Sequence, residues 1–293
     1  MRRGLDHVVH VVRDLDAAGE VYDLLGFTVG PRNHHPWGTH NRIVQTPGFF
    51  LELLEIAEPE KIPEAAGSHF SFGAFNRDFL ARNGQGLSMM VAEGSDPLAE
   101  KASFDAAGFG GFDLFDFSRL SRRADGEEVE VGFSLAFAQD PATPDTGFFT
   151  CTQRRPENFW APTMQRHTNG VTGVAGVVLV AETPLDHVSF IDTLVGVTPH
   201  RASDAWYVAT TPRGQIDIMT RGTFGERFGV PAPAGTGLRI GAVRFSSPGA
   251  DRLRRGLMAR GMLEQAIEGI VVVPPRAAMG ATIVFERSDA DPA

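Results

Sequence analysis

The sequence contains one cysteine, Cys151, and no apolar run long enough to cross a bilayer. A single cysteine excludes an internal disulfide and any zinc site built from several cysteines. The apolar N-terminus is interrupted by Asp6 and by the charges of Arg13 and Asp14, which a secretion signal would not carry. We therefore expect a cytoplasmic protein with no membrane partner.

The sequence also has no excess of basic residues: it contains 27 Lys and Arg and 36 Asp and Glu, and its formal net charge is −9. Proteins that bind nucleic acids normally present a basic face to the phosphates. The sequence also lacks a glycine-rich phosphate loop after a strand and a GxSxG nucleophile turn. These absences predict no nucleic-acid partner and no nucleotide cofactor, and they give acyl-transfer chemistry no support.

Tyrosine and tryptophan are scarce, with 2 and 3 residues, whereas phenylalanine occurs 22 times. Rings in such number must lie on the buried faces of strands or line a cavity, because water tolerates few of them at a surface. The composition therefore favours an aromatic interior.

One order of elements recurs along the chain, and such recurrence indicates a modular fold. Residues 5–14 are typical of a strand, and residues 14–27 of an amphipathic helix with Asp14 as its N-cap and Gly26 as its stop. Strands are expected next at 27–30, 38–48 and 49–56. The order returns within segments 86–153, 173–220 and 236–288. The sequence therefore predicts four βαβββ modules.

The polar, proline-containing segment 154–173 separates the second module from the third. We expect it to connect an N-terminal half, residues 1–165, to a C-terminal half, residues 166–293. A longer insertion at 59–85 joins the first two modules. Long ordered insertions often form lids or walls of sites, so this segment is a candidate wall.

The strings LDHVVHVVRDLDAA, LLGFTV and FFLELLEI resemble the opening module of the vicinal oxygen chelate superfamily, which includes glyoxalases, bleomycin resistance proteins and extradiol dioxygenases. HPWGTHNRIVQ, the insertion, PENFW and QRHTNG resemble a branch of it, the glyoxalase-like domain proteins. The resemblance implies an α+β fold in which four modules form two curved, cup-like sheets, mixed or antiparallel, with the helices outside.

The resemblance also implies a divalent metal ion, Zn, Ni, Mn or Fe, bound by residues of the first and last strands of each module. These positions fall on His7 and Glu52, an imidazole and a carboxylate that suit such an ion. The second module offers Ser88, a poor ligand, and then Gln153 or Cys151. We expect Gln153 as a third ligand through its carbonyl oxygen. The C-terminal half has no histidine at the equivalent positions, which disfavours a dioxygenase.

Strand alternation supports Glu52 independently, because a carboxylate between two leucines must face solvent, a cation or a ligand. His7 is alternatively a core histidine bound to a backbone carbonyl. Glu52 and His40 are the candidate acids or bases. Arg42 would bind a substrate carboxylate or pair with Glu52. The full set of substrate-binding candidates is His35, Trp37, Asn41, Arg42, His69, Glu157, Asn158, Trp160 and His167.

Three functions remain open at this point. The first is a metal-assisted lyase or isomerase acting on a small oxygenated metabolite. The second is a metal-free protein that binds an aromatic or drug-like small molecule, favoured by the abundant phenylalanine and the missing ligands. The third is a purely structural role. With four modules in one chain, we expect a monomer or a homodimer.

Overall fold

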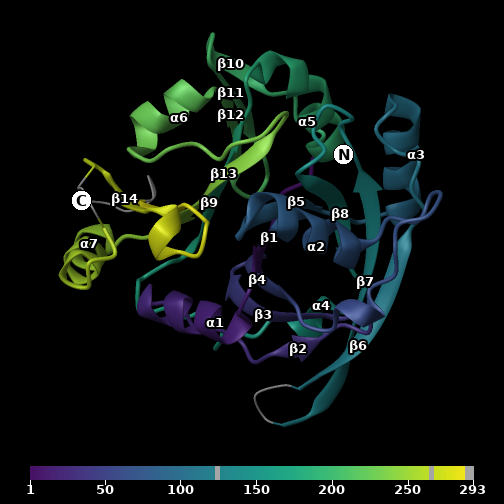
Figure 1. Cartoon of the computed structure of the whole chain (residues 1–293), viewed down its shortest axis with the longest axis horizontal. Coiled ribbons are helices and arrows are strands. Elements are labelled where there is room, and N and C mark those ends of the chain that lie inside the picture. The colour runs from purple at the N-terminus through teal and green to yellow at the C-terminus, as the bar shows by residue number, and fades with distance from the viewer. Residues whose placement is uncertain (123–125, 264–266, 288–293) are drawn as a thin grey trace.

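The computed structural model describes residues 1–122, 126–263 and 267–287, whose strands form two sheets (Figure 1). The first sheet has eight strands in the order β2-β3-β4-β1-β5-β8-β7-β6 and curls strongly, with the long β6–β7 hairpin along one side. Its strands are β1 (Leu5–Val12), β2 (Asn33–His34), β3 (Thr39–Thr46), β4 (Phe49–Ile56), β5 (Gly86–Glu93), β6 (Phe115–Arg122), β7 (Glu128–Ala138) and β8 (Gly147–Gln153).

The second sheet has seven strands in the order β10-β11-β12-β9-β13-β15-β14. Its strands are β9 (Gly173–Val180), β10 (His200–Ser203), β11 (Trp206–Thr210), β12 (Gln215–Met219), β13 (Arg239–Ser246), β14 (Ile270–Val273) and β15 (Ile283–Glu286).

The two sheets repeat one pattern of strand pairing. In each, the first strands of two modules form a central antiparallel pair, β1 with β5 and β9 with β13. Each of these first strands pairs in parallel with the last strand of its own module. The expected α+β class with mixed, curved sheets built from modules is therefore confirmed.

Each module has a helix between its first and second strands. These helices are α1 (Leu15–Leu24), α3 (Pro97–Ala107), α5 (Val188–Val195) and α7 (Ala250–Ala259). Helix α1 begins where the sequence predicts, because the Asp14 carboxylate accepts hydrogen bonds from the backbone N–H groups of Asp16 and Ala17, both at 3.0 Å. The remaining helices are α2 (Phe72–Asn83), α4 (Pro156–Phe159) and α6 (Arg221–Phe228), with short 3₁₀ turns at Pro59–Lys61, Pro184–His187 and Pro275–Ala277. No helix of the described residues is long and apolar enough to cross a membrane.

One hydrophobic core joins the outer faces of both sheets to the four module helices. It contains Leu51 and Leu53 of β4, Tyr22 of α1 and Phe245 of β13, all fully buried. The inner face of each sheet has its own cluster, covered by α2 on the first sheet and by α6 on the second. Helix α2, which belongs to the insertion at 59–85, therefore covers the inner face of the first sheet. Helix α6 covers the inner face of the second sheet, and the module pattern does not predict it.

One strand prediction needs correction. Residues 27–30 form no strand, because Phe27 turns into the core against Phe245, with ring centroids 5.1 Å apart, and Pro31 follows without an N–H donor. The second strand of that module is instead the two-residue β2. In the fourth module, the sequence pattern also predicts a second strand at 262–269; it falls partly on residues 264–266, which lie outside the described part of the chain, and it stays a prediction.

Residues of both sheets belong to one hydrophobic core, so the two halves are packed together. The division of the chain into halves near residue 165 stays a proposal. The first sheet ends at Gln153 and the second begins at Gly173. The connection between them is anchored by His167, whose Nε2 lies 2.7 Å from the Gln45 carbonyl and whose Nδ1 accepts from the Thr28 N–H at 3.0 Å.

His10 also joins the two halves and should make stability depend on pH. The Tyr22 hydroxyl donates to its Nδ1 at 2.9 Å, and its Nε2 donates to the Met279 carbonyl at 2.9 Å. Complete burial lowers the His10 pKa from 6.5 to about 4. As pH falls from 6.5 to about 4, His10 is therefore protonated in the unfolded chain but stays neutral in the folded chain. Stability from this group is present above pH 6.5 and declines by about 3 kcal/mol towards pH 4.

Urea unfolding at pH 7 and pH 4.5 measures this loss. His10→Gln removes the titrating group, so its stability should fall less between the two pH values than that of the parent. His200→Gln, at an exposed histidine, is the matched control and should keep the parental pH dependence. An unchanged pH dependence in His10→Gln would contradict the assignment.

Candidate functional site

A narrow pocket opens on the inner face of the first sheet, with a cavity volume of about 40 Å³. Aromatic rings form about half of its wall, and His7, Glu52, His35, Asn41 and Arg119 supply its polar groups. The rings are those of Trp37, Phe50, Phe72, Phe117, Phe133, Phe149 and Phe159. The cavity has room for an ion with one or two waters. We call it the first-sheet pocket.

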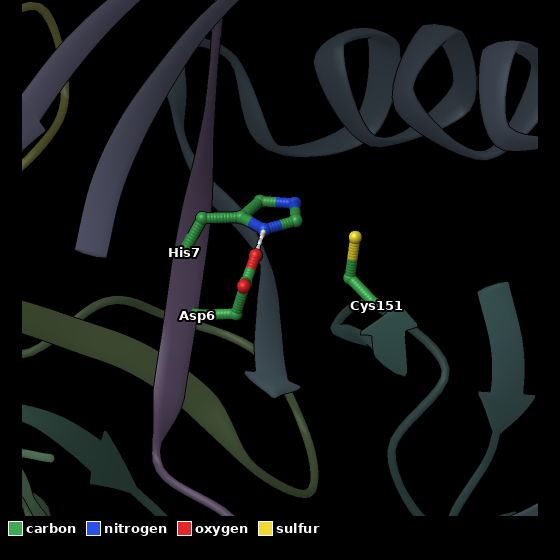
Figure 2. Close-up of side chains that lie close together, drawn as sticks. All are labelled: Asp6, His7 and Cys151. Atoms are coloured by element: carbon green, nitrogen blue, oxygen red, sulfur yellow. Dashed lines mark hydrogen bonds and ion pairs between the residues drawn. The ribbon is translucent and has the colours of Figure 1, made fainter. Parts of the chain in front are cut away.

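His7 enters this pocket with one ring nitrogen already held. Neighbouring residues of a strand normally face opposite sides, but the strand register shifts between Leu5 and His7, and the Asp6 carboxylate reaches the His7 Nδ1 at 2.5 Å (Figure 2). Both side chains are buried. The second oxygen of Asp6 accepts from Gln153 Nε2 at 3.1 Å. Asp6 therefore holds the proton of Nδ1 and turns the other ring nitrogen, Nε2, towards the pocket.

Glu52 faces His7 from the neighbouring strand. Leu51 and Leu53 point into the shared core, so alternation directs Glu52 to the inner face, where it is 5% exposed. Its Oε1 accepts from Asn41 Nδ2 at 2.6 Å, and its Oε2 lies 3.9 Å from His7 Nε2. Burial raises the pKa of Glu52, although His7 and Asn41 oppose the shift. The ionised carboxylate is therefore costly in this position unless a cation or a proton joins it.

His35 brings a third acceptor to the same place. It stacks on Trp37 with ring centroids 4.6 Å apart, and its Nδ1 lies 2.8 Å from the Thr39 hydroxyl. Its Nε2 lies 3.4 Å from Asn41 Nδ2 and 4.0 Å from Glu52 Oε1. Because the amide nitrogen of Asn41 can only donate a hydrogen bond, the His35 Nε2 is the acceptor. Burial, with a smaller contribution from Arg119, lowers the His35 pKa to about 3. The neutral ring therefore presents a lone pair at Nε2.

The Nε2 atoms of His7 and His35 thus converge on a carboxylate that has no lysine or arginine ion pair among the described residues. Acceptors that face one another across about 4 Å repel unless a positive charge lies between them. Two imidazoles and one carboxylate are also a donor set that suits a mid-row divalent ion. The residues present therefore fit such an ion.

Cys151 projects from β8 towards His7, and the ligand atoms of Asp6, His7 and Cys151 lie within 4.8 Å of one another (Figure 2). Burial raises the pKa of the Cys151 thiol well above its usual range, and the nearby carboxylates of Asp6 and Glu52 add to the shift. A protonated thiol is a weak ligand. The arrangement is better suited to orienting His7 than to holding an ion between these three groups.

Arg119, on the edge strand β6, is the pocket residue that sequence reasoning missed. Its Nη1 donates to Asn33 Oδ1 at 3.0 Å, while its buried Nε has no hydrogen-bond partner in the structure. Burial lowers the Arg119 pKa, and the charge of Glu52 opposes the shift. A signal was present, because Phe115, Phe117 and Arg119 alternate along one strand face. The other missed residue, Asp6, gave no such signal, since regular alternation places it opposite His7.

The structure brings five of the candidate residues together and leaves the others outside. The pocket contains His7, His35, Trp37, Asn41 and Glu52. His40 points into a polar cluster, with Nε2 2.9 Å from His34 Nδ1 and Nδ1 3.2 Å from Arg32 Nη1. Arg42 pairs with Asp16 at 2.7 Å and not with Glu52. Gln153 does not line the pocket and donates to Asp6. Those also outside are His69, Glu157, Asn158, Trp160 and His167.

Comparison with known proteins agrees with this architecture. A family model described as a glyoxalase-like domain matches residues 5–195, which extends beyond the first sheet through β9 and α5. No curated protein is similar enough in sequence to count as a match.

Solved structures resemble the chain along nearly its whole length. A hypothetical protein from Staphylococcus aureus has 14% identity and a TM-score of 0.62, covering 98% of this chain and 100% of its own. A mutant 4-hydroxymandelate synthase from Streptomyces coelicolor has 10% identity and a TM-score of 0.58, covering 100% and 95%. The Mn(II)-bound glyoxalase from Novosphingobium aromaticivorans has 12% identity and a TM-score of 0.55, covering 98% and 83%. At such identities the likeness concerns the fold alone.

The modules, the pairing of their strands and the family match over more than half of the sequence agree with one another. The chain belongs to the glyoxalase-like domain family of the vicinal oxygen chelate superfamily.

Proposed function

We propose that the protein is a metal-assisted lyase or isomerase acting on a small oxygenated metabolite in the first-sheet pocket. One observation carries the proposal: the buried Glu52 carboxylate lies 3.9 Å from His7 Nε2, and Asp6 fixes the other nitrogen of His7. His7 and Glu52 would hold a divalent ion. His35 would be the third ligand in place of Gln153, which acts on Asp6.

When bound, a divalent ion would polarise two adjacent oxygens of a substrate and thereby acidify a neighbouring C–H bond. The chain supplies the rest. Asp6 keeps the His7 lone pair aimed at the pocket, as carboxylates commonly do for metal-binding histidines. Glu52 has a pKa raised by burial, so an oxygen of Glu52 not engaged by an ion would accept a proton from carbon more readily than an exposed carboxylate.

The shape of the pocket limits the substrate. Arg119 offers a buried N–H without a partner, which suits a carboxylate or another anionic oxygen. The ring wall suits an apolar or aromatic body and excludes water from the polar groups. Because the cavity measures only about 40 Å³, a metabolite would have to displace part of this wall. Phe72 of the insertion helix α2 and Phe159 of α4 lie on short or inserted elements and are the rings we expect to move.

Metal titration tests this proposal. The Mn(II) ion of a glyoxalase with a similar fold makes Mn²⁺ the first probe, followed by Zn²⁺, Ni²⁺ and Fe²⁺. The parent should bind roughly one ion per chain, and His7→Ala should weaken binding at least about 10-fold by removing a ligand. Equilibrium dialysis with metal analysis gives both values.

His40→Ala is the matched control, because His40 is a nearby histidine that lies outside the pocket. It should bind the ion as the parent does. Equal loss in both variants, or no binding by the parent at any ion concentration, would exclude the first-sheet pocket as a metal site.

The ring wall favours a second candidate, a metal-free protein that binds an aromatic small molecule. Trp37 lies in the wall and would report occupancy through its fluorescence. Under this alternative, benzoate should quench the fluorescence saturably after treatment with EDTA, and Trp37→Phe should abolish that signal. The metal-assisted enzyme requires the titration above to succeed, so the two experiments separate the functions.

A further inference from the structure

The strand registers identify equivalent positions in the two sheets. In the central antiparallel pairs, His7 lies opposite Val91 and Gly176 lies opposite Arg244. In the parallel pairs, Glu52 lies beside Val9 and Asp217 lies beside Val178. In each module, the residue that pairs with the carboxylate therefore lies two positions after the first-strand residue: Val9 after His7, and Val178 after Gly176.

The same rule applied to the other module of each sheet gives Cys151, paired with Glu93, and Glu286, paired with Ser246. The four inner positions of the first sheet are His7, Glu52, Val91 and Cys151. Those of the second sheet are Gly176, Asp217, Arg244 and Glu286, which we call the second-sheet cluster.

The second-sheet cluster contains its own cation. Arg244 Nη2 lies 2.9 Å from Asp217 Oδ2, and Arg244 Nη1 lies 3.3 Å from both oxygens of Glu286. Arg244 is 5% exposed and Asp217 is 1% exposed. The other oxygen of Asp217 accepts from Trp206 Nε1 and Gln215 Nε2, both at 2.8 Å. Both last-strand carboxylates are thus paired with one cation that the chain itself supplies.

Gly176 makes room for this guanidinium. A Cβ atom at that position would lie 2.6 Å from Arg244 Nη2 and 2.3 Å from the Gln215 carbonyl oxygen. No side chain fits there, and therefore no imidazole equivalent to His7. Glycine on β9 thus leaves the space that the Arg244 guanidinium of β13 occupies.

We infer that the second-sheet cluster is a divalent-cation site closed by Arg244, whose guanidinium occupies the place between the last-strand carboxylates that an ion would take. Of the two inner faces, that of the first sheet is therefore open to a metal and that of the second sheet is closed. Removal of the guanidinium would leave the buried Asp217 and the partly buried Glu286 without the cation that they share, and a divalent ion would relieve their repulsion.

Arg244→Ala and Arg244→His test this inference, and Arg244→His keeps a side chain in the space and adds an imidazole. Equilibrium dialysis against Mn²⁺ should show one more ion per chain in each variant than in the parent. Mn²⁺ should also raise the melting temperature of each variant more than that of the parent. Adding Asp217→Asn and Glu286→Gln to Arg244→Ala should return the count to the parental value.

Three results would overturn the inference. One is a folded Arg244 variant with no extra ion, and another is an extra ion that survives loss of both carboxylates. The third result concerns the native chain and does not require any Arg244 variant to fold. It is that the parent binds an ion, that His7→Ala still binds it, and that Asp217→Asn no longer does. Since the count is taken as a difference from the parent, failure of the first-sheet pocket to bind metal leaves this test intact.

Discussion

Replacing Glu52 with glutamine should reduce affinity for a divalent ion at least about 100-fold and at the same time stabilise the ion-free protein by about 1–3 kcal/mol. The affinity falls because the pocket loses both an oxygen ligand and its negative charge. The stability rises because the buried carboxylate is penalised at pH 7, while the amide keeps an oxygen for the Asn41 N–H. Mn²⁺ dialysis and urea unfolding in the presence of EDTA measure the two effects.

Glu55→Gln is the matched control on the same strand. Glu55 lies outside the pocket, where its Oε2 accepts from Arg32 Nη1 at 2.7 Å. The control should leave ion affinity unchanged and should not gain stability. If Glu52→Gln kept the parental affinity, or destabilised the ion-free chain, the carboxylate would not be the strained ligand that we describe.

Asp217→Asn should destabilise the protein by about 3–5 kcal/mol, the loss typical of breaking a buried ion pair from one side. The substitution keeps the shape of the side chain and an oxygen for Trp206 but removes the charge that Arg244 faces at 2.9 Å. Arg244 then retains Glu286 alone. Urea unfolding followed by circular dichroism gives the free energy of unfolding.

Asp204→Asn provides the comparison, because Asp204 pairs with Arg201 at an exposed turn where water screens the charges. Its free energy of unfolding should match that of the parent within experimental error. A similarly small effect for Asp217→Asn would mean that the second-sheet cluster does not depend on charge neutralisation.

The module order could be predicted because each element has a local signal. Asp14 caps α1, Gly26 follows it, and the alternation of 49–56 places Leu51 and Leu53 in the core and Glu52 in the pocket. Residues 27–30 carried the same β-like signal, but packing of Phe27 in the shared core outweighed it. Helix α6 was missed because nothing in the third module's pattern requires it.

The site was predictable only where strand alternation was regular. His7 and Glu52 followed from it, whereas Asp6 reaches His7 only through a register shift between β1 and β5. His40 follows the pocket residue His35 closely in sequence, yet it faces the opposite way, into contacts with Arg32 and His34. Its proposed acid or base role therefore has no support from its position.

By itself, the sequence determined the order of the modules, the faces of the strands with regular alternation and the presence of an acid and an imidazole on the inner side of the first sheet, since these depend on neighbours along the chain. Only the tertiary structure decided which charges meet. It brought Arg119 into the pocket that contains Glu52 and placed Arg244 between Asp217 and Glu286. The physical reason is that pairing registers between distant strands, and the shifts within them, are set by packing of the whole sheet and not by any local pattern.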